Sequence, residues 1–234
     1  MFPVAILAGG LATRLRPMTE RVPKALIEVA GRPFIYRQLD FLREQGVTRV
    51  VLCIGYLGEQ IEALIGDGAA FDLVVRYSRD GPALLGTGGA LKRALPLLGQ
   101  RFFVLYGDSF LPCDFQKVQR AFLASSRSAL MTVLHNRGQW DKSNVMFRNG
   151  EIVEYNKHAT RPEMEYIDYG LGILSADVFA GYSERTPFDL ADIYHQLSRA
   201  GKLAGHEVYE RFYEIGSPEG LGDTEAFFSK KDRS

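Results

Sequence analysis

An apolar run leads directly into a glycine pair and a basic segment in the stretch VAILAGGLATRLRP, residues 4–17. Its first part, residues 4–8, is unbroken in apolar character, as expected for a strand covered on both faces of a sheet. Gly9 and Gly10 follow, and glycine lets main-chain N–H groups approach a phosphate because it has no Cβ. The stretch therefore predicts a strand that ends in a phosphate-binding loop.

Further apolar runs alternate with segments of helical period along the first half of the chain. The runs that we predict to be central strands are residues 4–8, 49–54, 73–77, 102–106 and 129–134. Apolar residues recur at helical spacing around residues 35–42 and 61–65, and a third helix is expected over residues 87–98. This alternation predicts an α/β fold with a mixed, mostly parallel central sheet and helices on both faces.

The pattern changes after about residue 140. Asn149-Gly150 separates two short β-rich runs, which is a strong hairpin signal. Asp189 and Ser217 are candidate helix N-caps, the latter with Pro218 at the first helical position. No Pro/Gly/Ser-rich linker divides the chain. We therefore expect one domain over residues 1–234, with a small antiparallel region in the half from residue 140 onward.

Charge and cysteine content exclude several classes of partner and site. The 28 Lys and Arg residues balance the 28 Asp and Glu residues, so the chain lacks the positive field that drives nucleic-acid or anionic-membrane binding. Two cysteines give no disulfide framework, and four scattered histidines lack zinc-ligand spacing. We expect no nucleic acid, no membrane and a reducing, cytoplasmic location; a homo-oligomer is left open.

Basic residues concentrate next to the glycine pair within this neutral chain. Residues 11–37 hold six basic side chains against two acidic ones, an excess suited to a polyanion. No G-x-G-x-x-G motif opens here, residues 86–91 lack its third glycine, and no Gly-Lys-Ser/Thr follows at Walker spacing. Two common nucleotide-binding motifs are thereby excluded.

These residues resemble a known family, the sugar-1-phosphate nucleotidylyltransferases, in a short form without the β-helix domain of longer relatives. The matching segments, in the order of the family, are residues 7–17, Pro23-Lys24, residues 86–90, Gly107-Asp108, Asn156-Lys157, residues 168–170 and residues 214–219. The resemblance covers nearly the whole chain. It implies a nucleotide-binding half at residues 1–139 and a sugar-phosphate-binding half at residues 140–234.

The resemblance implies transfer of a nucleoside monophosphate from a nucleoside triphosphate to a sugar 1-phosphate, with Mg²⁺ as cofactor and pyrophosphate as second product. The catalytic residues it implies are Arg14, Lys24 and Asp108. The nucleotide-binding residues it implies are Leu7, Ala8, Gly9, Gly10, Thr13, Arg14, Lys24, Gly86, Thr87 and Gly88. An in-line attack on the α-phosphorus must bring two polyanions together, so the site has to supply positive charge.

The remaining implied residues concern the metal and the sugar. Asp108 follows an apolar run, and open α/β sheets bind ligands at the carboxyl ends of their strands. Its implied partner for Mg²⁺ is Glu214, where the family has aspartate. The implied sugar-phosphate residues are Asn144, Asn156, Lys157, Asp168 and Gly170, of which Asn156 and Asp168 depart from the residues usual in the family.

The sequence leaves the substrates open. Relatives place base-reading residues near Ser78 and Arg79, and these side chains do not separate the four bases. We favour GTP with heptose or mannose 1-phosphate, in nucleotide-sugar synthesis for cell-surface polysaccharide. The alternatives are a uridylyltransferase for N-acetylmuramic acid or another hexose 1-phosphate, a cytidylyltransferase for a non-sugar phosphate, and a non-catalytic nucleotide-sugar sensor.

Overall fold

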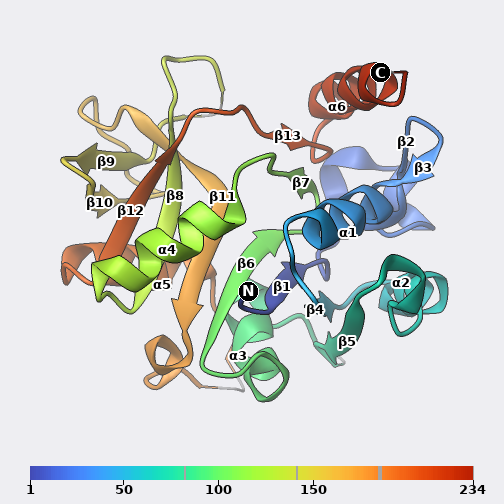
Figure 1. Cartoon of the computed structure of the whole chain (residues 1–234), viewed down its shortest axis with the longest axis horizontal. Coiled ribbons are helices and arrows are strands. Elements are labelled where there is room, and N and C mark those ends of the chain that lie inside the picture. Colours follow the sequence, from blue (N-terminus) through green and yellow to red (C-terminus); the bar gives the residue numbers. More distant parts are fainter. Residues whose placement is uncertain (82, 141, 184–185, 234) are drawn as a thin grey trace.

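A nine-stranded mixed sheet runs through the molecule in the order β5-β4-β1-β6-β11-β8-β12-β10-β9 (Figure 1). The computed structural model describes residues 1–81, 83–140, 142–183 and 186–233. The strands of the sheet are β1 (Val4–Leu7), β4 (Arg49–Ile54), β5 (Val74–Arg79), β6 (Arg101–Tyr106), β8 (Ala129–His135), β9 (Val145–Arg148), β10 (Glu151–Tyr155), β11 (Tyr166–Ser175) and β12 (Leu203–Val208). All five predicted strands are present.

The parallel part of the sheet is built around β1, which pairs with β4 on one side and β6 on the other. β5 pairs in parallel with β4 and forms the edge of the sheet, so its prediction as a central strand is wrong. Its residues alternate between exposed and buried, with Val74 half exposed, because only one face of this edge strand is fully covered. The sheet places the carboxyl ends of β5, β4, β1 and β6 side by side.

The second half of the sheet contains the antiparallel pairings. β11 runs antiparallel to both β6 and β8, and β12 is parallel to β8. β9 and β10 form the predicted hairpin, with Asn149 at φ 51° and Gly150 at φ 81° in the turn. Positive φ at both central residues is the requirement of a type I′ turn. The prediction of an antiparallel region after residue 140 is confirmed.

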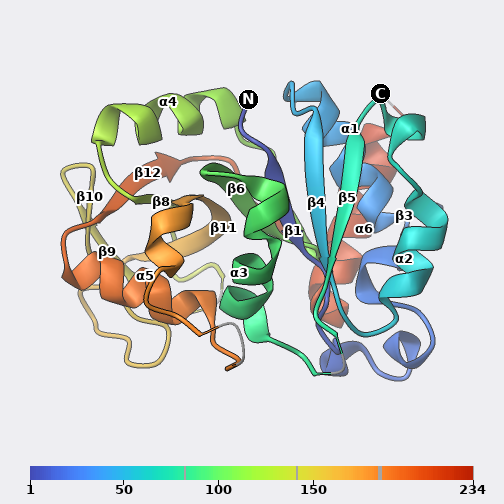
Figure 2. The same cartoon turned by 90° about the horizontal axis from the view of Figure 1, so that it is seen from below.

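Helices cover both faces of the sheet (Figure 2). The α-helices are α1 (Phe34–Glu44), α2 (Gly58–Ile65), α3 (Gly86–Leu98), α4 (Phe115–Ser125), α5 (Leu190–Arg199) and α6 (Pro218–Lys231). α1, α2 and α4 pack on one face in a core that contains Ile6, while α3 and α5 pack on the other in a core that contains Ala5. Adjacent residues of β1 thus point into different cores, as the alternation of side chains along a strand requires.

Short elements connect these layers near the carboxyl end of β1. The 3₁₀ helices are η1 (Thr13–Leu15), η2 (Met18–Glu20), η3 (Lys24–Leu26), η4 (Ala69–Phe71) and η5 (Ala176–Phe179), and two small hairpin-like sheets pair β2 (Glu28–Val29) with β3 (Arg32–Pro33) and β7 (Ser109–Phe110) with β13 (Tyr213–Glu214). Both predicted N-caps are confirmed: Asp189 accepts from Ala191 N at 3.0 Å, and Ser217 accepts from Gly220 N at 3.0 Å. No helix among the described residues is both long and apolar enough to cross a membrane.

Candidate active site

The predicted phosphate loop leaves β1 at Leu7 and passes close to the end of β4. A Cβ atom on Gly9 would lie 3.0 Å from Gly55 N, so glycine is needed there for the two main chains to pack. Gly10 is exposed, and a Cβ atom there would meet nothing within 4 Å. The first glycine therefore fixes the loop against its neighbour, and the second leaves open space for a ligand.

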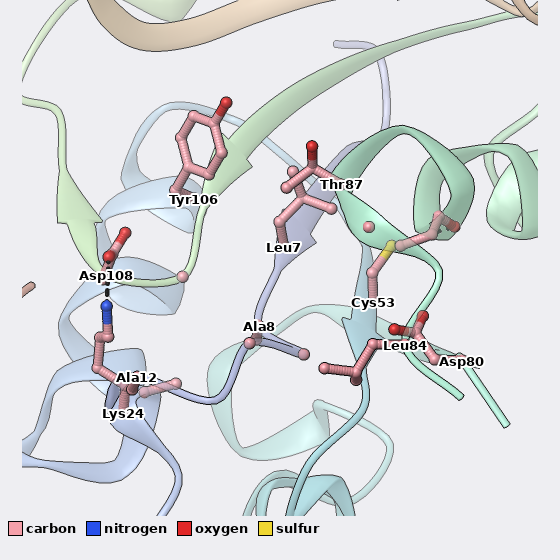
Figure 3. Close-up of a pocket in the computed structure, with 16 residues that line it drawn as sticks. Leu7, Ala8, Ala12, Lys24, Cys53, Asp80, Leu84, Thr87, Tyr106 and Asp108 are labelled. Carbon is pink, nitrogen blue, oxygen red and sulfur yellow. Dashed lines mark hydrogen bonds and ion pairs between the residues drawn. The ribbon is translucent and has the colours of Figure 1, made fainter. Parts of the chain in front are cut away.

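A pocket of about 240 Å³ opens beside this loop, at the carboxyl ends of all four parallel strands. Predicted residues that line it are Leu7, Ala8, Gly9, Gly10, Lys24, Gly86, Thr87 and Asp108 (Figure 3). Thr13, Arg14 and Gly88 were also predicted for the nucleotide and are not among its lining residues. The remaining lining residues include Cys53, Asp80, Leu84 and Tyr106.

Lys24 and Asp108 face each other at one end of the pocket (Figure 3). Lys24 lies on η3, Asp108 follows β6, and Lys24 Nζ lies 2.8 Å from Asp108 Oδ2. The two side chains keep 19% and 27% of their exposure, so a ligand in the pocket can reach both. An ammonium group held by a carboxylate is thus placed where a phosphate would enter.

Arg14, Asp108 and Glu214 meet around Gly216. A Cβ atom on Gly216 would lie 3.3 Å from Arg14 Nη2 and 3.3 Å from Asp108 Oδ2, with Glu214 Oε2 at 2.5 Å. β7 and β13 make this approach possible, because Glu214 pairs with Ser109 and Ile215 N donates to Asp108 O at 2.9 Å. The guanidinium of Arg14 therefore shares one space with the two carboxylates, although it lies outside the pocket lining.

The two carboxylates fit a divalent cation of the Mg²⁺ type. Glu214 Oε1 accepts from Ser217 Oγ at 2.6 Å and Oε2 accepts from Gly216 N, which fixes the side chain beside Asp108. No third His, Cys, Asp or Glu joins them within the part of the chain that is described. Mg²⁺ is commonly held by one or two carboxylates, with phosphate oxygens and water completing its octahedron. Asp108 and Glu214 supply the protein's share of such a site.

The glycine-rich start of α3 binds the second half of the chain. Gly86 has φ 72°, and a Cβ atom there would lie 2.5 Å from Phe188 O. A Cβ atom on Gly88 would lie 2.4 Å from the Phe188 ring. Thr87 Oγ1 donates to Asp189 Oδ1 at 2.7 Å and accepts from Leu190 N at 2.8 Å. Gly88 therefore serves packing between the halves, whereas Gly86 and Thr87 both line the pocket and hold the start of α5.

The residues predicted for the sugar phosphate gather between β9, β11 and the end of β10. Asn144 Oδ1 accepts from Asp168 N at 2.9 Å, and Asp168 Oδ1 accepts from Gly170 N at 2.9 Å. Asn156 Oδ1 accepts from His158 N and Ala159 N, so this oxygen closes a turn and is not presented to a ligand. The exposed Lys157 places Nζ 3.5 Å from Asp189 Oδ2. None of these five residues lines the pocket beside the loop.

Tyr106 connects the pocket to this second group. It lines the pocket at the end of β6, and a Cβ atom on Gly170, whose φ is 99°, would lie 3.8 Å from its ring. Burial and then the carboxylates of Asp168, Asp189 and Asp108 raise the pKa of its hydroxyl. Carboxylates from both groups thus act on one phenol, which places the predicted nucleotide and sugar-phosphate residues on either side of Tyr106.

The charges beside Tyr106 are shifted in opposite directions. Burial raises the pKa of Asp168 to about 6, against the hydrogen bond from Gly170 N and the charge of Lys157. Burial also acts on Asp189, but the hydrogen bonds from Ala191 N and Thr87 Oγ1, together with Lys157, lower the pKa of that carboxyl. Two carboxylates with different proton affinities therefore face the space next to Lys157.

We expect Asp168→Asn to stabilise the protein at neutral pH. Between pH 3.8 and about 6 the folded state keeps a proton on Asp168 that the unfolded state releases, so the free energy of unfolding falls as the pH rises through this window. The variant escapes this loss, and its advantage should reach up to about 3 kcal/mol near neutral pH and vanish near pH 4. Urea unfolding at both pH values measures it, with the exposed Asp72→Asn as control; an equal difference at both would contradict the shift.

Sequence reasoning missed three residues of the site. Tyr106 was given no function, Asp189 was predicted only as a helix cap, and Asp80 was not singled out. Asp80 follows β5 just as Asp108 follows β6, so the rule applied to Asp108 would have found it. The link between Thr87 and Asp189 spans 102 residues of sequence, and no local pattern signals such a contact.

Comparison with known proteins agrees with this geometry. A family model described as nucleotidyl transferase matches residues 4–221. N-acetylmuramate alpha-1-phosphate uridylyltransferase of Neisseria meningitidis is 31% identical over 218 residues, covering 91% of this chain and 92% of that protein. D-glycero-alpha-D-manno-heptose 1-phosphate guanylyltransferase of Campylobacter jejuni is 26% identical, covering 92% and 94%. HddC from Yersinia pseudotuberculosis, complexed with GMP-PN, superposes with a TM-score of 0.80 at 26% identity, covering 97% and 100%. The chain therefore belongs to the nucleotidyl transferase family, and both the family and the α/β fold predicted from its motifs are confirmed.

Proposed function

We propose that this enzyme transfers guanosine monophosphate from GTP to a neutral sugar 1-phosphate, heptose or mannose, with Mg²⁺ as cofactor. The observation that carries the proposal is the convergence of Arg14, Lys24 and Asp108 at one end of a pocket whose other walls come from the glycine loop and the start of α3. Cationic groups beside a carboxylate at such a place suit the junction of two phosphorylated reactants.

The reaction forms one P–O bond and breaks another. A phosphate oxygen of the sugar 1-phosphate attacks the α-phosphorus, the bond from that phosphorus to the bridging oxygen breaks, and pyrophosphate leaves with the electron pair. Lys24 and Arg14 hold the phosphates in line and neutralise charge that grows on the departing group. When bound by Asp108 and Glu214, Mg²⁺ would add positive charge at the phosphate oxygens.

Charge on the far side of Tyr106 favours a neutral sugar. Asp168 and Asp189 face this space with one cation, Lys157, between them. Their oxygens accept hydrogen bonds from sugar hydroxyls, and Lys157 is available for the phosphate. The carboxylate of an N-acetylmuramic acid would meet two like charges there, which is unfavourable. The alternative uridylyltransferase reading is supported by the relative from Neisseria meningitidis, and the guanylyltransferase reading by that from Campylobacter jejuni.

A panel of GTP, UTP, dTTP and CTP against mannose, heptose, glucose and N-acetylmuramic acid 1-phosphates tests the proposal through release of pyrophosphate. We expect the highest kcat/KM with GTP and a neutral sugar 1-phosphate, and no turnover without a divalent cation. Turnover confined to phosphocholine would favour the cytidylyltransferase alternative. Ligand binding without any product would favour the sensor, although Arg14 and Lys24 are both retained here.

A further inference from the structure

A buried carboxylate lies at the end of the pocket opposite Lys24 and Asp108. Asp80 follows β5, is 6% exposed, and lines the pocket beside Cys53 and Leu84 (Figure 3). A Cβ atom on Gly55 would lie 3.3 Å from Asp80 Oδ2 and 2.8 Å from Gly9 O. The carboxylate therefore sits against the main chain of the phosphate loop, at the far end of the pocket from the groups placed for phosphate chemistry.

The backbone around Asp80 is held firmly from both sides. Asp80 N donates to Ile54 O at 3.0 Å, and Arg93 Nη1 donates to Asp80 O at 2.6 Å. These bonds fix the residue to the neighbouring strand β4 and to α3. The position of its side chain is thus determined by the sheet and a helix, as expected for a group that recognises a ligand by geometry.

Only one oxygen of this carboxylate is satisfied within the protein. Oδ2 accepts from Leu85 N at 3.3 Å, and Oδ1 has no hydrogen-bond partner among the described residues. Burial raises the pKa of Asp80, against the hydrogen bond from Leu85 N and the charge of Arg93. A carboxylate oxygen left without a donor in a pocket is costly, and a ligand that brings donors removes that cost.

The walls beside Asp80 suit a flat ring. Leu7, Leu84 and Ala90 line the pocket with apolar groups, and Leu84 keeps 39% of its exposure in the free protein. A purine placed between such groups buries its faces and presents its edge to the carboxylate. The triphosphate of the same molecule then extends toward Lys24 and Asp108.

We propose that Asp80 reads the base of the nucleotide and selects guanine, an inference that rests on the proposed function and identifies its specificity-determining residue. A carboxylate only accepts hydrogen bonds. Guanine alone among the common bases presents two donors side by side on its Watson–Crick edge, N1–H and the 2-amino group. Uracil and thymine present one donor between two carbonyl oxygens, and adenine and cytosine place an acceptor next to their amino group.

Equilibrium binding of GTP, ITP and UTP, each with Mg²⁺, tests this without any sugar or turnover. ITP is guanosine triphosphate without the 2-amino group. We expect GTP to bind about 10- to 100-fold more tightly than UTP, and ITP to lose about tenfold of that affinity. These comparisons use the wild-type protein, so they do not depend on the folding of a variant. Equal binding of GTP and ITP, or tighter binding of UTP, would overturn the assignment.

Asp80→Asn supplies the second arm. An amide offers one donor and one acceptor, which matches N3–H and O4 of uracil, so we expect GTP binding to weaken about 10- to 100-fold while UTP binding is kept or improved. Glu59→Gln, an exposed change on α2 outside the pocket, should leave the ratio unchanged. An unchanged GTP/UTP ratio in the folded Asp80→Asn protein rejects the inference. Turnover of UTP with a sugar 1-phosphate in that case would leave the transferase reaction intact, whereas absence of turnover with all nucleotides would reject the proposed function itself.

Discussion

Replacing Arg14 by alanine is expected to lower kcat by about 100- to 1,000-fold, because the charge nearest to Asp108 and Glu214 around Gly216 would be lost where negative charge develops. Arg14 is exposed on the short helix η1, and no packing depends on its side chain, so the melting temperature should not change. Pyrophosphate release at saturating concentrations of both substrates measures the effect on kcat separately from binding.

The matched control for this variant is Arg21→Ala. Arg21 belongs to the same basic segment and is exposed, but only its carbonyl oxygen is used in a hydrogen bond, from Gln60. The two variants remove the same charge from the same region, so a general electrostatic effect would lower both rates. A kcat of Arg14→Ala close to that of Arg21→Ala would remove Arg14 from the catalytic site.

Asp108→Asn is expected to lower kcat by about 1,000-fold or more and to raise the Mg²⁺ concentration needed for half-maximal rate. The substitution removes one of two carboxylates proposed to hold the ion and leaves Lys24 Nζ without its partner at 2.8 Å. Both side chains of that pair are partly exposed, so the ion pair itself contributes little to stability. A titration of Mg²⁺ against initial rate, with thermal unfolding alongside, separates these effects.

Asp72→Asn is the control for loss of a carboxylate elsewhere on the surface. Asp72 has φ 54°, a conformation that asparagine also tolerates, and it lies outside the pocket. Its kcat and its Mg²⁺ dependence should equal those of the wild type. If Asp108→Asn shared that behaviour, the metal site would have to be sought elsewhere.

The fold was predictable where one strand is buried on both faces. β1, β4, β6 and β8 have four to seven consecutive residues that are almost entirely buried, and they appear in the sequence as unbroken apolar runs. The hairpin at Asn149-Gly150 was predictable because its turn requires positive φ at both residues. Edge position is different: β5 is apolar enough to look central, and only the pairing of the whole sheet shows that it is not.

The site was predictable where chemistry lies in a short motif. The glycine loop, Lys24 and Asp108 carried enough local pattern to be named, and the structure places them around one pocket. The contacts that join the two halves were not predictable, since the bond from Thr87 to Asp189 depends on how α3 and α5 pack. The same holds for Asn156, whose oxygen closes a local turn although its place in the motif predicted a sugar contact.

The fate of the phosphates tests the central claim most directly. GTP labelled at the α-phosphate and GTP labelled at the γ-phosphate are each incubated with mannose or heptose 1-phosphate, Mg²⁺ and the wild-type enzyme. Attack on the α-phosphorus within the space shared by Arg14, Lys24 and Asp108 predicts α-label in a nucleotide sugar and γ-label in pyrophosphate, in equal amounts. Release of γ-label as orthophosphate, with no labelled nucleotide sugar, would contradict it.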